Sequence, residues 1–236
     1  MSAVVPETPP PPPPSSGASF DFLKPFTFAF DDPRWVPKIL IGGAFVFASF
    51  FIIGAFFVYG YLARLVRNVI NGVQHPLPEW DDLGEYFTEG LKLFVVALIY
   101  TIPIVIVAGI VFVPAIIASG STDNETIRSV AGMSASCVWC MIFPLGLALA
   151  LWMPAALMMV VVTGEFSAGF DFGRILGFIR ANLGNYLLAF VAWMVARFAA
   201  SLGFLLLCVG IIFTMFWAFI VAGYAFGQVY RLSKVR

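Results

Sequence analysis

Four long apolar stretches dominate the sequence, and each is at least as long as a membrane-crossing helix requires, which is about 20 residues. They cover residues 39–62, 93–118, 133–162 and 186–229. The last stretch is about twice too long for one crossing at a rise of 1.5 Å per residue, so we predict a break near residues 207–210. The sequence therefore predicts an all-α, polytopic transmembrane helix bundle of about five membrane segments, at residues 39–62, 93–118, 133–162, 186–206 and 211–229.

The composition argues against a soluble fold for these stretches. The chain is 61% hydrophobic and 11% charged, whereas an average soluble domain is about 25% charged. A soluble protein needs a polar exterior, and this chain has too little polar material to make one. The lipid bilayer is therefore the first partner that we expect. A formal net charge of zero gives no reason to expect nucleic acid as a partner.

Residues 1–18 are predicted to form a disordered, proline-rich tail. An unbroken run of proline at positions 9–14 favours an extended polyproline II conformation. The tail has neither the basic residues nor the apolar core of a secretory signal peptide. A plain spacer is the simpler interpretation, and a segment that binds a proline-docking partner is the alternative. Residues 19–236 are predicted to form a single transmembrane domain.

The distribution of basic residues predicts the orientation of the chain. Lysine and arginine gather between the first and second segments, between the third and fourth, and at residues 231–236. The positive-inside rule places all three regions, and hence the C-terminus, in the cytoplasm. The loop at residues 119–130 contains only Arg128, beside Asp123 and Glu125, and is expected outside.

The first segment leaves two alternatives. If residues 39–62 cross the membrane once, Lys24, Arg34 and Lys38 lie outside, against the positive-inside rule. If the segment enters and returns as a hairpin, these residues lie inside, and Gly54 would permit the bend. The apolar run has no proline and the right length for one crossing, so we expect a straight pass and keep the hairpin as the alternative.

Two regions beside the segments are expected at the membrane interface. Asp32-Pro33 is predicted to start a helix, with Trp35 and Lys38 as interfacial anchors. Residues 169–182 carry apolar side chains at helical spacing, interspersed with arginine. This pattern indicates an amphipathic interfacial helix, with a helix packed on the bundle as the alternative. The apolar positions are Phe172, Ile175, Leu176 and Ile179.

The most distinctive loop has the sequence Leu77-Pro78-Glu79-Trp80-Asp81-Asp82. Its prolines fix an extended backbone, and Asp82 with Glu85 matches the spacing of a capping box. Trp80 is expected in the headgroup layer. This structural interpretation explains most of the loop. The functional alternative is a docking or cation-binding patch formed by Glu79, Trp80, Asp81 and Asp82.

Several short motifs resemble one known family. They are Gly60-Tyr61-Leu62-Ala63-Arg64, Asn71-Gly72, the loop just described, Glu89-Gly90-Leu91-Lys92 and Gly227-Gln228-Val229-Tyr230-Arg231. On these residues the chain resembles domain-of-unknown-function family 4013, which comprises prokaryotic multi-pass membrane proteins. The resemblance covers most of the chain after the proline tail. It implies a bacterial or archaeal cell membrane, and it implies no catalytic residue.

Arg197 is the only charged residue well inside a predicted segment. A buried charge there costs about 3 kcal/mol on insertion scales unless it faces the bundle or reaches the interface. No Asp or Glu lies in any predicted segment. Lipid phosphate, or backbone carbonyls freed by proline kinks, are therefore the expected partners, and Arg197 is a candidate binding residue. The prolines concerned are Pro103, Pro114, Pro144 and Pro154.

Three weaker patterns are interpreted as packing. Cys137-Val138-Trp139-Cys140 lacks further ligands for a metal, so apolar packing is expected and no metal or cofactor is predicted. Small residues at helical spacing predict close helix contacts, within one chain or between copies, at Ala192, Ala196, Ala200, Gly223 and Gly227. Phe20-Asp21-Phe22 and Phe170-Asp171-Phe172 precede the first and last apolar stretches, which is the pattern of a parallel repeat or of chance.

The sequence contains no nucleophile–base pair and no phosphate-binding loop, so no catalytic residue is predicted. Our leading hypothesis is a non-enzymatic membrane scaffold or assembly factor, with a membrane-protein partner or a second copy of the chain. The alternative is a small-solute transporter or channel, which Arg197 and the four segment prolines favour.

Overall fold

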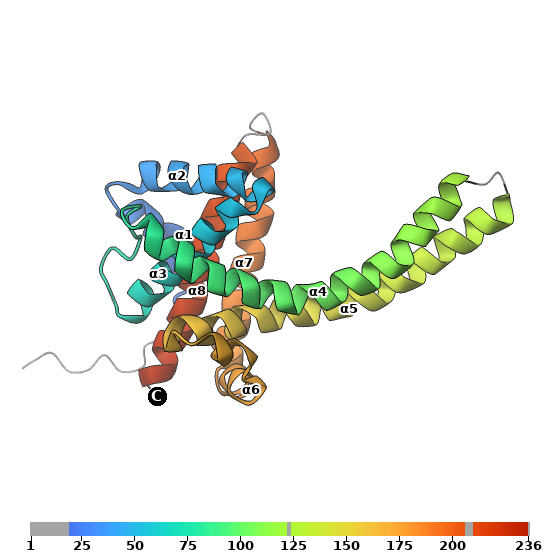
Figure 1. The fold of residues 1–236 in the computed structure, drawn as a ribbon. Helices are drawn as coiled ribbons and strands as arrows, with labels where there is room; N and C mark the ends of the chain where they lie inside the picture. The colour runs from blue at the N-terminus through green and yellow to red at the C-terminus, as the bar shows by residue number, and fades with distance from the viewer. Residues whose placement is uncertain (1–18, 122–123, 206–209, 236) are drawn as a thin grey trace, which may run out of the picture.

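The computed structural model describes residues 19–121, 124–205 and 210–235, so the expected tail at residues 1–18 lies outside the described residues. All regular structure in the described parts is helical, which confirms the predicted fold class (Figure 1). In chain order, with η marking 3₁₀ helices, the elements are α1 (Lys24–Thr27), η1 (Phe28–Asp31), α2 (Trp35–Ala48), η2 (Ser49–Phe51), α3 (Ile53–Ile70), α4 (Leu83–Ser121), α5 (Glu125–Thr163), η3 (Phe166–Phe170), α6 (Phe172–Ala181), α7 (Leu183–Ser201), η4 (Leu202–Leu205) and α8 (Gly210–Val235).

Within the described parts, five helices are long and apolar enough to cross a membrane. They are Ile53–Ile70, Leu83–Ile117, Ile142–Thr163, Leu183–Leu205 and Gly210–Lys234. This confirms a bundle of about five spans. The long last stretch forms two helices, because α7 ends at Ser201 and α8 begins at Gly210. Residues 206–209, where we predicted the break, lie outside the described residues.

The first apolar segment is not one straight helix, so our expectation of a straight pass is wrong. The chain breaks at Ile52, whose φ of 69° is rare for a β-branched residue. Gly54 follows the break, and a Cβ there would lie 2.1 Å from the Phe45 carbonyl oxygen, so only glycine fits. Helices α2 and α3 therefore form a helical hairpin, with the bend near Gly54, while its return to the same side of the membrane stays a prediction. The sequence did not reveal this turn, because the residues that form it are mostly apolar, like the rest of the segment.

Helices α4 and α5 are the longest elements, with 39 residues each. At 1.5 Å per residue each is about 58 Å long. Figure 1 shows the pair leaving the other helices as a curved, two-helix projection. We call its outer part, beyond Pro103 in α4 and before Pro144 in α5, the arm. The four segment prolines lie inside these helices without ending them.

Helix α6 begins at a capped N-terminus and packs on the bundle. The Asp171 carboxylate accepts a hydrogen bond from the backbone N–H of Arg174 at 3.0 Å. Ile175 is fully buried, whereas Phe172 is exposed. The face of α6 that carries Ile175 therefore packs on the bundle, which agrees with the alternative that we kept for this helix. Asp21 accepts hydrogen bonds from the N–H groups of Leu23 and Lys24 just before and at the start of α1, but the N-cap residue of α1 is Leu23, so the two Phe-Asp-Phe motifs are not equivalent caps.

Small residues bring the helices together, as predicted, within one chain. Ala192, Ala196 and Ala200 of α7 are fully buried, and the last two pack in one cluster with Ala218 and Val221 of α8. Gly223 and Gly227, also of α8, face α3, where their nearest neighbours are Leu65 and Val69. Helices α3 and α8 therefore run side by side in the same direction.

Helices α3 and α4 approach each other at two glycines of the family-like motifs. A Cβ on Gly60 would lie 2.0 Å from the carbonyl oxygen of Tyr86, and a Cβ on Gly90 would lie 1.6 Å from that of Phe56. The two backbones are thus in direct contact, and no larger residue fits at either position. This close packing fixes the start of α4 and, with it, the loop that precedes α4.

Candidate functional site

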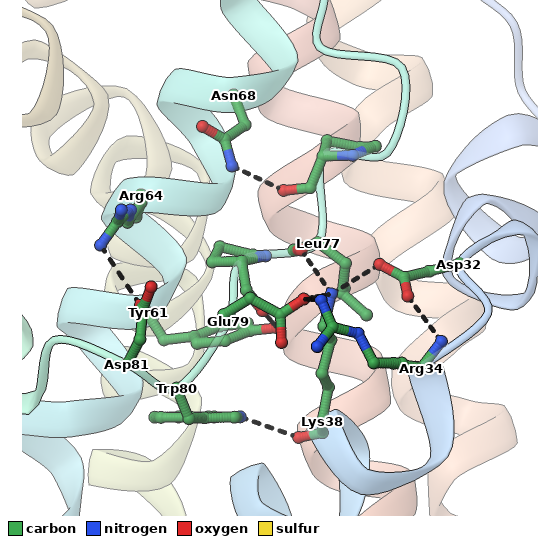
Figure 2. A network of polar contacts seen from close by, with 12 residues as sticks. Asp32, Arg34, Lys38, Tyr61, Arg64, Asn68, Leu77, Glu79, Trp80 and Asp81 are labelled. Carbon is green, nitrogen blue, oxygen red and sulfur yellow. Dashed lines mark hydrogen bonds and ion pairs between the residues drawn. The ribbon is translucent and has the colours of Figure 1, made fainter.

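The loop at residues 71–82 lies across α2 and α3 and is fastened to both. The Tyr61 hydroxyl donates a hydrogen bond to the Pro78 carbonyl at 3.0 Å, and the Asn68 amide donates one to the Pro76 carbonyl at 2.9 Å. The Leu77 side chain is buried in the cluster that includes Tyr61. The loop predicted to be extended by its prolines is therefore an ordered strap over the hairpin (Figure 2).

Lys38 of α2 contacts this strap through Leu77 and Glu79. We call Lys38 with its partners the clasp. Its ammonium group is 2.6 Å from Asp32 Oδ2, 2.7 Å from Glu79 Oε1 and 2.9 Å from the Leu77 carbonyl oxygen (Figure 2). An ammonium has three N–H donors, and these three acceptors match them. Lys38 is only 4% exposed. It is therefore a buried structural cation, not the interfacial anchor that we expected.

Burial and charge act in opposite directions on Asp32. Burial alone would raise the pKa of its carboxyl, but hydrogen bonds from the Lys38 ammonium and the Arg34 backbone N–H outweigh burial. The pKa of Asp32 therefore lies below its ordinary value of 3.8. The Asp32 carboxylate is consequently charged at neutral pH.

Trp80 packs beside the clasp, on the side formed by aromatic rings. Its ring stacks on Tyr61 with centroids 4.2 Å apart and on Phe45 at 4.9 Å, and it also contacts Phe216. Its indole N–H donates a hydrogen bond to the Lys38 carbonyl at 3.0 Å. Trp80 thus joins α2, α3 and α8. The sequence led us to expect it among lipid headgroups, whereas tertiary aromatic partners hold it partly buried.

The other acidic residues of the loop also have partners within the chain. Asp82 accepts a hydrogen bond from the Glu85 N–H at 3.0 Å, which is the N-cap half of the predicted capping box. The Glu85 carboxylate turns to Arg64 at 3.4 Å instead of completing the box. Asp81 lies 3.8 Å from the same guanidinium. Contacts within the chain therefore give each of these carboxylates a structural role. That they also bind an outside partner stays a prediction.

One ion pair joins three helices and was missed by sequence reasoning. The Arg67 guanidinium contacts both carboxylate oxygens of Glu89 at 2.6 and 2.7 Å, and its Nε donates to the Val161 carbonyl at 3.2 Å. It therefore links α3 to both α4 and α5. The signal available was an arginine and a glutamate in neighbouring family-like motifs, but only the fold shows that they face each other.

Arg197 lies apart from the clasp, in α7. Its NH1 is 2.9 Å from the Met215 sulfur, and its guanidinium carbon lies 5.9 Å from the centroid of the Phe219 ring. A thioether is a weak acceptor. No ion pair joins Arg197 to a carboxylate of the residues that the structure describes.

The C-x-x-C motif is only partly covered. Cys140 is a free, exposed cysteine, whereas the side chain of Cys137 lies outside the described residues. In the described ranges, no three His, Cys, Asp or Glu side chains are placed to hold a metal ion. The two predicted binding candidates are therefore the clasp loop and Arg197, and the fold keeps them separate.

No curated protein and no solved structure matches the chain. The model of the family described as "Protein of unknown function (DUF4013)" matches residues 45–209. This match includes most of the hairpin, the clasp loop, both glycine contacts between α3 and α4, and the arm. It ends before the Gly227–Arg231 motif that also resembled the family. Because more than half of the chain is covered, the protein belongs to domain-of-unknown-function family 4013.

Proposed function

We propose that this protein is a non-enzymatic scaffold or assembly factor for other proteins of a prokaryotic cell membrane, with its C-terminus and clasp in the cytoplasm. The arm is the observation that carries this proposal. It projects from the other helices (Figure 1) and is therefore free to contact another molecule along its length. Its exposed side chains are mainly apolar, among them Val105, Ile106, Ile110, Val113, Met133, Trp139 and Phe143.

The glycines of the arm support a protein partner in particular. Gly109 and Gly120 of α4 are about three helical turns apart and hence on one face. A Cβ at either position would meet no atom within 4 Å. In membranes, helices associate through small residues that allow close backbone approach. Gly60 and Gly90 already make such close backbone contacts, between α3 and α4 of this chain. The open glycines of the arm are suited to a helix from outside.

The clasp supports the absence of catalysis. Glu79 and Asp32 neutralise a buried lysine, Asp82 caps a helix, and Glu85 pairs with arginine. Each carboxylate is therefore committed to a structural partner in the described residues. A general acid or base needs a group that is free to exchange protons with a substrate.

Copurification from a mild detergent tests the proposal. We expect wild type to retain a stoichiometric membrane-protein partner or a second copy. The substitution Gly109→Leu together with Gly120→Leu should release that partner, because leucine blocks close helix approach. Gly177→Leu is the matched control, since a Cβ at this α6 position also meets nothing within 4 Å. Purification of wild type without any partner, together with a solute-dependent thermal shift, would overturn the proposal in favour of a small-solute transporter.

A further inference from the structure

An apolar cavity lies where the arm leaves the bundle. Its volume is about 580 Å³, and α3, α5 and α8 supply most of its walls. Ligand-binding cavities are typically about 300–1,000 Å³. The lining is almost wholly hydrocarbon, with Val58, Leu62, Leu149, Met153 and Phe226 as representative residues. The cavity could therefore hold a hydrocarbon chain but offers little to a polar solute.

The length of the cavity fits one leaflet of a bilayer. Its walls on α3 extend from Ala55 to Val66, which is about 16 Å at 1.5 Å per residue. Half of a hydrocarbon core about 30 Å thick is about 15 Å. Tyr59 also lines the cavity, and its hydroxyl has no hydrogen-bond partner among the described residues.

Arg197 is adjacent to two residues that line this cavity. Trp193, one turn earlier in α7, and Phe219, whose ring lies against the Arg197 guanidinium, both line the cavity. Apart from the Met215 sulfur and this ring, the guanidinium has no polar partner among the described residues. It presents five N–H donors in a planar fork, a geometry that matches phosphate and carboxylate oxygens. Its charge is also costly within a bilayer unless an anion compensates it.

We propose that the cavity binds one hydrocarbon chain of an anionic amphiphile and that Arg197 binds its phosphate or carboxylate head. The cavity alone would accept the chain of any lipid. The unpaired arginine makes the site selective for a negatively charged head. Phospholipids and fatty acids share this chemistry, and the experiment separates them. The inference does not depend on the proposed scaffold function.

Quenching of Trp193 by brominated chains tests the site. The full-length protein is reconstituted in phosphatidylcholine vesicles that contain a minor amount of brominated phosphatidylglycerol, brominated fatty acid or brominated phosphatidylcholine. The Trp193 signal is the difference between wild type and Trp193→Phe. We expect strong quenching by at least one anionic lipid and weak quenching by the zwitterionic one. Which anionic lipid quenches identifies the source. Trp139, which is exposed on the arm, should respond equally to all three.

Substitutions then separate the head from the chain. Arg197→Leu should raise the amount of anionic lipid needed for half-maximal quenching of Trp193 roughly ten-fold or more, the loss of affinity expected for a charge-assisted hydrogen bond. Arg197→Lys should restore only part of it, because lysine lacks the planar fork. Gly146→Leu should fill the cavity, since Gly146 lines it with open space around its Cβ, and Gly132→Leu is the matched open position outside it. Equal quenching by anionic and zwitterionic lipids, or no loss in Arg197→Leu, would overturn the proposal.

Discussion

The ring of Phe45 in α2 stacks on the ring of Phe57 in α3, with centroids 4.6 Å apart. The two residues face each other across the turn at Ile52. At the other end of the hairpin, Lys38 and Arg64 are bridged by the same loop through Glu79 and Asp81. The two ends of the first apolar segment therefore lie on one side of the molecule.

Cysteine accessibility distinguishes this hairpin from a single crossing. We predict that Arg34→Cys and Gln74→Cys share one side of the membrane, the cytoplasmic side, and that Thr126→Cys lies on the other. All three side chains are exposed in the structure. Leu77 is unsuitable as a probe because it is buried. In a background without the three native cysteines, an impermeant reagent added to intact cells should label only position 126. Labelling of position 34 but not position 74 would restore the straight pass.

Lys38→Met should destabilise the protein by about 3–5 kcal/mol, because it leaves the Asp32 carboxylate buried without its cation. Denaturant titration of the detergent-solubilised protein measures the loss. Arg34→Met is the matched control, since Arg34 is 69% exposed although it also contacts Glu79, and the expected loss is at most about 1 kcal/mol. Adding Asp32→Asn to Lys38→Met should recover part of the stability. Equal effects of the two methionine variants would mean that the clasp does not hold the hairpin.

The clasp should also make stability depend on pH in the acid range. The pKa of Asp32 is lower in the folded chain than its ordinary value of 3.8, so the unfolded chain binds this proton more readily. The stability from the ionised form is complete above about pH 4 and is lost as the pH falls through the lowered pKa. Melting temperatures of wild type and Asp32→Asn should therefore differ at neutral pH and converge below 3.8. A constant difference across this range would contradict the assignment.

Gly60→Ala and Gly90→Ala should each destabilise the contact between α3 and α4, because the added Cβ would enter the backbone of the facing helix. Gly177→Ala provides the control in open space, where alanine favours a helix over glycine by up to about 1 kcal/mol. In thermal unfolding, Gly60→Ala and Gly90→Ala should each melt at a lower temperature than wild type. Gly177→Ala should melt at the same temperature or a higher one. A neutral Gly90→Ala would show that the helices can separate without cost.

Local signals predicted what depends on near neighbours. The sequence predicted the N-cap at Asp82 and the helix that begins after Asp171, because both depend on residues within one or two turns. It predicted a close helix contact at Ala196 from the small residues one turn away on either side. Ile52 gave no such signal, because a β-branched residue rarely adopts a positive φ. The residues on either side of it, Phe45 and Phe57, pack against each other across the turn. Lys38 and Glu79, or Arg67 and Glu89, pair across different helices. Their burial depends on how helices pack, and no single segment of the sequence contains that information.

The clasp has a consequence for biosynthesis. Asp32 and Lys38 leave the ribosome well before Leu77 and Glu79, so the hairpin can enter the bilayer before its strap exists. During that interval the neighbouring Asp32 carboxylate, 2.6 Å from the ammonium in the finished fold, is the only clasp side chain already made that can neutralise Lys38. In the re-entrant topology that we predict, both ends of the hairpin stay on the cytoplasmic side, and neither this pair nor Arg34 is translocated. In that topology the first insertion event carries no charge across the membrane.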